Sequence, residues 1–334
     1  MSQEPKNPSR ESNVREYFVR KTLIYVEGNT DKEYFKQIQL FNRQLTEIRI
    51  PNEAVKNNKI DIEKQIFNLE EPTNAIGIVD KDIDQKKKYE SLFYTDYYDL
   101  EMTIFWFSNK VDLFNNLLNY CREKIDNISK TDFDKVLYRT FIITALMGRL
   151  RLWLKNENYK ANVDRIPTEI KANLPNYLKT QTEVPYFEIL KSSRYFFETM
   201  YKHKLFDEDF NNELKLFLKT YFKFLGFQYW HLMEKEISDF LNKYSTNVDD
   251  LSHFSRNDAV FHYCNSHVFV EMFVRGLIHS TESILTDEQI TELRFSIERK
   301  IRFSLNKEEL MVSNLIKNIQ IWEQKYGKKL IFGY

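Results

Sequence analysis

Glycine and proline are scarce in this sequence, with seven of each in 334 residues. These two residues punctuate turns, so their scarcity favours long helices over many short turns. The length allows two or three domains and a sizeable core. Aromatic residues are abundant by contrast, with 27 Phe and 20 Tyr.

Cysteine and long apolar runs are also lacking. The two cysteines, Cys121 and Cys264, have no paired spacing, which argues against a disulfide framework and against a cysteine zinc site. No apolar run approaches the ~20 residues that span a bilayer. Residues 1–15 are expected to form a flexible N-terminal segment without the apolar core of a signal peptide. We therefore expect a cytoplasmic protein with no membrane association.

The chain has no net charge, since 49 basic residues balance 49 acidic ones. Its overall field gives no argument for nucleic-acid binding, so any such surface must be a local patch. The P-loop pattern Gly-x-x-x-x-Gly-Lys-Ser/Thr is absent as well. P-loop ATP hydrolysis would therefore have to come from another polypeptide.

The first third of the sequence has the pattern of an α/β sheet. Short apolar, β-branched runs predict strands, and the segments between them predict helices. Thr30-x-x-Glu33 has the pattern of a capping box, which predicts that the first helix begins at Asp31. The alternation predicts a mostly parallel sheet with right-handed crossovers. The expected strands are 22–26, 46–50, 75–79 and 91–95, and the expected helices are 31–41, 60–69 and 99–107.

From about residue 110 the apolar period becomes helical. No strand signal is convincing in this part, so residues 111–334 are expected to form a helical domain for interaction or dimerisation, after a sheet domain at 16–110. Thr286-x-x-Gln289 predicts a second capping box. The expected helices are 111–127, 132–156, 185–204, 208–243, 258–279, 287–304 and 307–326.

Acidic residues follow two of the predicted strands. Glu27 comes directly after the first strand, and Asp80 directly after the third. Ligands bind at the carboxyl ends of the strands in open α/β sheets, so these side chains are expected to converge. Asp82 alternates with Asp80 and would face the same side of an extended segment. Like charges repel without a cation, and hard cations take oxygen ligands. The sequence predicts a Mg²⁺ (or Mn²⁺) site with Glu27, Asp80 and Asp82 as catalytic residues.

Two further carboxylates are candidate metal ligands. Asp84 is the third alternate after Asp80, and Asp31 is expected in the first turn of the first helix, where a negative charge also suits the helix dipole. A calcium loop over residues 80–91 is the rival interpretation. It fails because position six is Gln85 instead of glycine and position twelve is Ser91 instead of glutamate.

Other polar groups have weaker patterns. Lys86, Lys87 and Lys88 follow the acidic loop and form either a solvated face or a grip on polynucleotide phosphates. The six histidines all lie between residues 203 and 279, away from the acidic motifs. His262 and His267 are five residues apart, a poor spacing for a helical metal pair, so structural or surface roles are expected.

The acidic motifs resemble those of a known family. The resemblance covers residues 20–110 and is to TOPRIM domains, more narrowly to the AriB-like TOPRIM effector nucleases of the PARIS anti-phage defence system. It implies an α/β TOPRIM-like parallel sheet followed by a mainly α-helical domain. It also suggests a second-metal ligand in the third motif, where we favour Glu101, since Asp99 could equally be a helix N-cap. The motifs are Val26-Glu27-Gly28-x-x-Asp31, Val79-Asp80-x-Asp82-x-Asp84 and Thr95-Asp96-Tyr97-Tyr98-Asp99-Leu100-Glu101.

The resemblance implies a function. It is that of a Mg-dependent endonuclease acting as a toxic effector, with RNA such as tRNA favoured over DNA. It further implies restraint by an ABC-type, AriA-like ATPase partner, and an active homodimer is expected on symmetry grounds. The alternative is a catalytically silent TOPRIM-like scaffold whose aromatic-rich helices dock on a partner protein.

Overall fold

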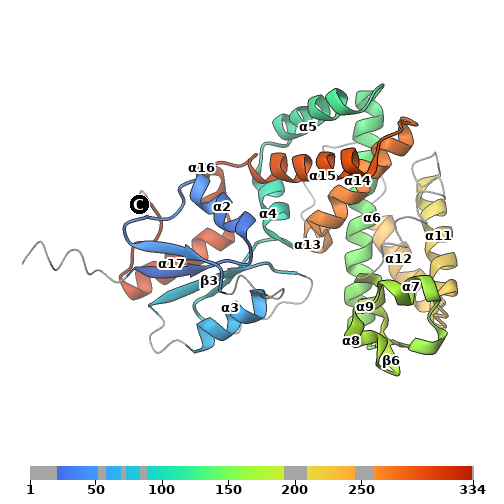
Figure 1. Cartoon of the computed structure of the whole chain (residues 1–334), viewed down its shortest axis with the longest axis horizontal. Coiled ribbons are helices and arrows are strands. Elements are labelled where there is room, and N and C mark those ends of the chain that lie inside the picture. The colour runs from blue at the N-terminus through green and yellow to red at the C-terminus, as the bar shows by residue number, and fades with distance from the viewer. Residues whose placement is uncertain are drawn as a thin grey trace, which may run out of the picture. The chain divides into compact units, whose positions relative to one another are not determined.

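The computed structural model describes residues 21–51, 58–68, 73–82, 89–191, 209–244 and 259–332. These residues divide into two compact units, which are described separately (Figure 1). The sheet unit comprises the described residues up to Asp80, those from 89 to Thr95, and those from Asn306 onward. The helical unit comprises Lys81, Asp82 and the described residues from Asp96 to Leu305.

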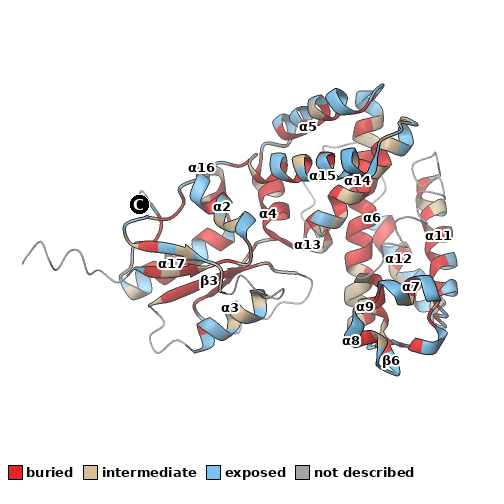
Figure 2. Ribbon diagram, viewed as in Figure 1, coloured by how far each residue is buried: buried red, intermediate tan, exposed pale blue. Residues whose placement is uncertain are grey.

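A four-stranded parallel sheet in the order β2-β1-β3-β4 is the centre of the sheet unit. In the register of the two central strands, Ile24 of β1 pairs with Ile76 of β3. Every residue of β3 is buried, which Figure 2 shows as a continuous red strand. Burial on both faces explains why β3 reads as an unbroken apolar run. The strands are β1 (Thr22–Tyr25), β2 (Thr46–Arg49), β3 (Ala75–Val79) and β4 (Leu92–Tyr94).

Four helices complete the sheet unit: α2 (Asn29–Gln37), α3 (Asn58–Phe67), α16 (Lys307–Leu310) and α17 (Asn314–Tyr326). Figure 1 shows α2 and α3 on opposite faces of the sheet, as right-handed crossovers in opposite directions require. Helix α17 contacts β4, where Trp322 Nε1 donates to Ser91 Oγ at 3.1 Å. The C-terminal helices thus pack with the sheet, which differs from the expected single helical domain over 111–334.

The helical unit is built around α6 (Lys130–Asn156), and most residues in the central part of this helix are buried. It contacts α9, α12, α13 and α14. A Cβ at Gly148 would lie 2.0 Å from the carbonyl oxygen of Tyr263, so only glycine permits this approach of α13. The other helices are α4 (Leu100–Phe107), α5 (Lys110–Lys124), α7 (Thr168–Asn173), α8 (Asn176–Lys179), α9 (Tyr186–Lys191), α11 (Phe210–Phe224), α12 (Trp230–Tyr244), α13 (Ala259–Tyr263), α14 (Ser266–Ser280) and α15 (Asp287–Arg302), with a 3₁₀ turn at Val163–Arg165.

Three expected helices are each divided in two. The prediction of 208–243 was wrong at Gly226, whose φ of 70° is left-handed and ends α11. The prediction of 258–279 was wrong at Asn265, whose side chain accepts from the Val268 N–H and begins α14. The prediction of 307–326 was wrong at Ser313, which caps α17 in the same way. Beyond Lys191, the expected helix 185–204 lies outside the described residues.

A short antiparallel pair, β5 (Lys160–Asn162) and β6 (Glu183–Pro185), lies where no strand was expected. Each strand is only three residues long and buries one side chain, Ala161 or Val184, so no alternating pattern could develop. The Thr286-x-x-Gln289 capping box is confirmed at α15. None of the described helices combines the length and apolar character needed to cross a membrane.

Candidate functional site

The ends of β1 and β3 meet through a hydrogen bond between two predicted site residues. Glu27 follows β1, and its Oε1 accepts from the Asp80 backbone N–H at 2.7 Å. Asp80 follows β3, the parallel neighbour of β1. The structure therefore brings together two residues that are 53 positions apart, at the edge of the sheet that the sequence indicated. Both residues are partly exposed, which leaves this edge accessible to a ligand.

Asp31 lies near the same edge of the sheet as Glu27, because it belongs to the first turn of α2, which begins just after Glu27 and Gly28. Its Oδ2 accepts from the Gly28 backbone N–H at 3.1 Å. The expected capping box from Thr30 to Glu33 was wrong: Gly28 is the N-cap, and the acidic residue three positions later is Asp31. The helix begins two residues early because this carboxylate satisfies the cap N–H.

A cation also reaches this edge. Lys59, in the first turn of α3, donates from Nζ to the Asp80 carbonyl oxygen at 2.7 Å. The same ammonium lies 5.8 Å from the centre of the Tyr94 ring. Lys59 was not among the predicted site residues, since one lysine after the second strand is an ordinary solvated residue. A basic residue at a helix N-terminus opposes the helix dipole, and this was the only signal available.

The donor set fits a hard divalent cation in chemistry. Glu27, Asp31 and Asp80 offer only oxygen, which Mg²⁺ and Mn²⁺ prefer. Across the described residues, no three His, Cys, Asp or Glu side chains already converge closely enough to hold an ion. Glu27 and Asp80 are the two candidate ligands that a hydrogen bond joins directly. A carboxylate that accepts one N–H retains further lone pairs for a metal.

Asp82 belongs to the helical unit, because the division falls between Asp80 and Lys81. Its backbone N–H donates to the Tyr98 carbonyl oxygen at 2.7 Å, and its φ is 54°. The expected extended segment through Asp82 was wrong, since that φ is left-handed. Such a conformation is uncommon outside glycine and is held here by the Tyr98 contact. Its role as a metal ligand stays a prediction.

Asp99 is a buried helix cap. Its Oδ1 accepts from the Met102 N–H at 2.9 Å, and its Oδ2 accepts from the Ser266 N–H at 2.8 Å. The carboxylate therefore serves the first turns of both α4 and α14. Burial raises the pKa of Asp99, and the nearby charge of Glu101 raises it further. The N-cap alternative for Asp99 is confirmed.

Glu101, the favoured second-metal ligand, lies in a buried ion pair. Its Oε1 accepts from Arg302 Nε at 3.0 Å and also from Arg302 Nη2. Both side chains are less than 10 % exposed. The guanidinium thus supplies the positive charge next to this carboxylate in the helical unit. Nothing in the sequence linked the two residues, which are 201 positions apart.

A second polar group in the helical unit gathers around Lys81. Its Nζ donates to the Asp96 carbonyl oxygen at 3.2 Å and lies 3.4 Å from His262 Nδ1. The His262 ring lies 4.9 Å from the Tyr97 ring. A structural role for His262 agrees with these contacts. The remaining predicted site residues, Asp84 and Lys86–Lys88, lie outside the described residues.

No protein-family model matches the chain, and no curated protein is significantly similar to it in sequence.

Proposed function

We propose that this protein is a metal-dependent nuclease that hydrolyses phosphodiesters, with its reaction centre at the carboxyl edge of the parallel sheet. The observation that carries the proposal is the hydrogen bond from the Asp80 N–H to Glu27. It joins the ends of two neighbouring parallel strands, each of which is followed by an acidic residue. Open α/β sheets bind ligands at this edge.

Glu27 and Asp80 would hold a Mg²⁺ or Mn²⁺ ion, with Asp31 as a third oxygen donor. When bound, such an ion polarises the phosphate and lowers the pKa of a water molecule. Lys59, anchored to the Asp80 carbonyl, adds a positive charge that would attract the phosphate group. The backbone bonds of Glu27 and Asp31 fix the positions from which these side chains would act.

The wider biological role is also proposed on the motif resemblance. The protein would be a toxic effector in anti-phage defence, acting on RNA such as tRNA rather than on DNA. An ABC-type ATPase partner would restrain it, and the active form would be a homodimer.

The scaffold alternative has one observation in its favour. Glu27 and Asp31 both accept backbone N–H groups, which is a structural role that needs no metal. In a scaffold the two carboxylates would only stabilise the ends of β1 and α2. The two proposals differ in whether the negative charge of Glu27 is needed. A glutamine at this position would still accept the Asp80 N–H, so its amide keeps the structural role and removes only the charge.

Cleavage by the purified full chain separates these proposals. Labelled tRNA and DNA are incubated with Mg²⁺, with Mn²⁺ and with EDTA. We expect metal-dependent cleavage by the parent, and at least a hundredfold loss in Glu27→Gln with the fold retained. Glu33→Gln on the exposed face of α2 is the matched control and should cleave normally. Undiminished cleavage by folded Glu27→Gln would exclude Glu27 from the reaction, and metal-independent cleavage would exclude the metal.

A further inference from the structure

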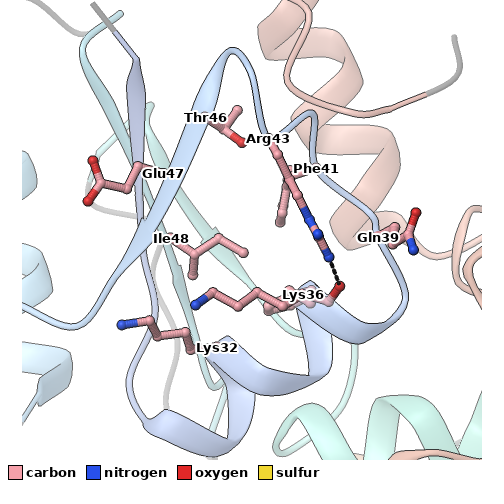
Figure 3. A pocket seen from close by; sticks show the side chains of 9 residues that line it. Lys32, Lys36, Gln39, Phe41, Arg43, Thr46, Glu47 and Ile48 are labelled. Atoms are coloured by element: carbon pink, nitrogen blue, oxygen red, sulfur yellow. Dashed lines mark hydrogen bonds between the residues drawn. The ribbon is translucent and has the colours of Figure 1, made fainter.

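A groove of about 450 Å³ lies between α2 and β2 of the sheet unit (Figure 3). Its charged residues are Lys32, Lys36, Arg43 and Glu47, and its apolar part consists of Phe35, Phe41 and Ile48. Figure 3 shows the ammonium groups of Lys32 and Lys36 extending in the same direction, alongside Ile48 of β2. The groove is thus bordered by a row of cations on one helix.

The charge of the groove is positive. Its one carboxylate, Glu47, is paired with Arg49 through bonds of 2.9 and 3.1 Å. The described part of the chain places no carboxylate within ion-pair distance of Lys32, Lys36 or Arg43. The pKa of Glu47 is lowered, first by its hydrogen bond with Arg49 and then by neighbouring cations that include Lys32. That shift is what a locally positive field produces.

Backbone contacts hold Arg43 in place. Its Nη2 donates to the Lys36 carbonyl oxygen at 3.1 Å, which is the dashed bond in Figure 3. Lys21 donates from Nζ to the Arg43 carbonyl oxygen at 2.8 Å and brings one more cation to this side. Arg43 is therefore oriented over the last turn of α2, although neither bond neutralises its charge.

A solvated edge is the simpler interpretation, because charged side chains protect an edge strand such as β2 from pairing with other chains. It does not explain why all the unpaired charges have one sign. Two lysines four residues apart on a helix repel each other by about 0.2–0.5 kcal/mol. Lys32, whose backbone N–H donates to the Gly28 carbonyl oxygen at the start of the helix, also opposes the helix dipole, whereas Lys36 in the last turn suits it. An anion in the groove would relieve both effects.

The position of the groove connects it with the candidate site. Helix α2 begins directly after Glu27 and Gly28, so Lys32 and Lys36 follow Glu27 by five and nine residues. At about 1.5 Å per residue, the two lysines are roughly 6 Å apart along the helix axis. Helix α2 starts beside Glu27 and carries these two cations in succession. Such an arrangement suits a polymer with repeated negative charges, such as the phosphates of a polynucleotide. A single small anion would need only one of them.

The apolar part of the groove indicates what is recognised. Phe35 is 1 % exposed and Phe41 is 4 % exposed, so neither ring offers a face on which a base could stack. The exposed or partly exposed charged groups are the cations and Glu47, which is already paired with Arg49. Contacts of this kind bind phosphates and position a nucleic acid without reading its sequence.

We propose that this groove binds the sugar–phosphate backbone of a polynucleotide, with Lys32, Lys36 and Arg43 as its phosphate contacts. The inference rests on the proposed function in one respect: the polynucleotide is the substrate of the carboxylate edge. Binding is independent of sequence and falls steeply with salt. The groove holds the strand on one side of the cleavage position and needs no metal for this.

Binding measured without cleavage tests the proposal. Fluorescence anisotropy of a labelled single-stranded RNA is followed in EDTA, between about 50 and 200 mM NaCl. The variant is Lys32→Ala/Lys36→Ala in the full chain. The matched control is Lys219→Ala/Lys223→Ala, which removes two exposed lysines at the same spacing from α11 of the helical unit. Alanine favours helix, so both variants are expected to fold, and circular dichroism would check this.

We expect the groove variant to bind more weakly and to lose about 1.4 from the slope of log K against log salt, since each single-strand phosphate contact contributes about 0.7. The control should keep the parent slope. Parent-like binding by the groove variant overturns the proposal, as does an equal loss in the control. Inorganic phosphate that displaces the RNA more than its ionic strength accounts for would show a site for a small anion. That result would also overturn the proposal.

The two proposals fail separately. Cleavage that persists in Mg²⁺ while the groove variant binds like the parent defeats the groove and leaves the nuclease proposal standing. Groove-dependent binding without any metal-dependent cleavage supports the groove as a polynucleotide surface and defeats the nuclease proposal.

Discussion

Two pairs of candidate site carboxylates, one in each unit of this protein, are held in opposite ways. At the edge of the sheet, Glu27 and Asp80 are partly exposed, and backbone N–H or lysine groups position them. In the helical unit, Asp99 and Glu101 are buried. Asp99 caps α4 there and also accepts the Ser266 N–H at the start of α14, and Glu101 is paired with Arg302. The first pair is partly exposed to solvent, whereas the second pair is buried and committed to the fold.

The comparison shows that residue type and position after a strand do not assign a role. Glu27 and Asp99 both follow a short strand and come just before a helix. What separates them is burial and the identity of the hydrogen-bond partner. A buried carboxylate needs such partners to offset desolvation, and its removal is costly. A partly exposed carboxylate can be neutralised with little effect on the fold.

The largest expected effect is a loss in the free energy of unfolding, caused by the substitution Glu101→Gln. The substitution leaves the Arg302 guanidinium buried without its countercharge, which costs about 3–5 kcal/mol in comparable pairs. Denaturant unfolding measures the loss, and the exposed Glu123→Gln on α5 serves as the control. A loss below about 0.5 kcal/mol, within the range of surface substitutions, would remove the distinction between the two units.

Asp99→Asn should have the next largest effect. An amide has only one acceptor oxygen, so it cannot accept from both the Met102 and Ser266 N–H groups. One buried donor is then unsatisfied, at a cost of about 1–3 kcal/mol. Amide hydrogen exchange reports which one: faster exchange is expected at the first turn of α4 or of α14. Unchanged exchange at both would show that Asp99 is not the cap that joins them.

The smallest effect concerns His267, whose Nδ1 lies 3.2 Å from Glu298 Oε1. This hydrogen bond is the main cause that raises the His267 pKa to about 9. A folded-state pKa above the unfolded value of about 6.5 means that the stabilisation is complete below pH 6.5 and is lost as the pH rises through 9. The side chain is 65 % exposed, so solvent screening keeps the effect small.

His267→Gln should flatten the dependence of unfolding on pH between about 6.5 and 9. Unfolding midpoints of the parent and the variant, compared at both ends of this window, measure it. An identical pH dependence in the two proteins would mean that the pair with Glu298 contributes nothing.

Much of the sheet unit was predictable because its signals are local. Strands β1 and β3 are short apolar runs that contain β-branched residues, and the alternation of strands with helices indicates parallel pairing. That Glu27 and Asp80 approach each other follows from this topology alone. The predicted start of α2 was wrong because two overlapping patterns suit a helix N-terminus. Thr30 with Glu33 was expected to form the capping box, but in the structure the Asp31 carboxylate accepts the Gly28 N–H.

The contacts of the helical unit were not predictable in the same way. Arg302 reaches Glu101 across 201 positions, and the Ser266 N–H reaches Asp99 across 167. One arginine or serine in a helical segment gives no indication of such a partner. The breaks at Gly226 and Asn265 were visible as a glycine and a capping residue, but the apolar period continues through both and conceals them.

Metal titration of Glu27→Gln tests the central claim most directly. Glutamine keeps the acceptor for the Asp80 N–H and removes only the charge, so the sheet edge should stay folded while it loses its affinity for a cation. Isothermal calorimetry with Mg²⁺ and Mn²⁺ compares the parent, Glu27→Gln and the control Glu33→Gln. We predict binding at least tenfold weaker in Glu27→Gln, about 1.4 kcal/mol, and parent affinity in the control. Equal affinity in all three would contradict the assignment of the metal to the carboxyl edge of the sheet.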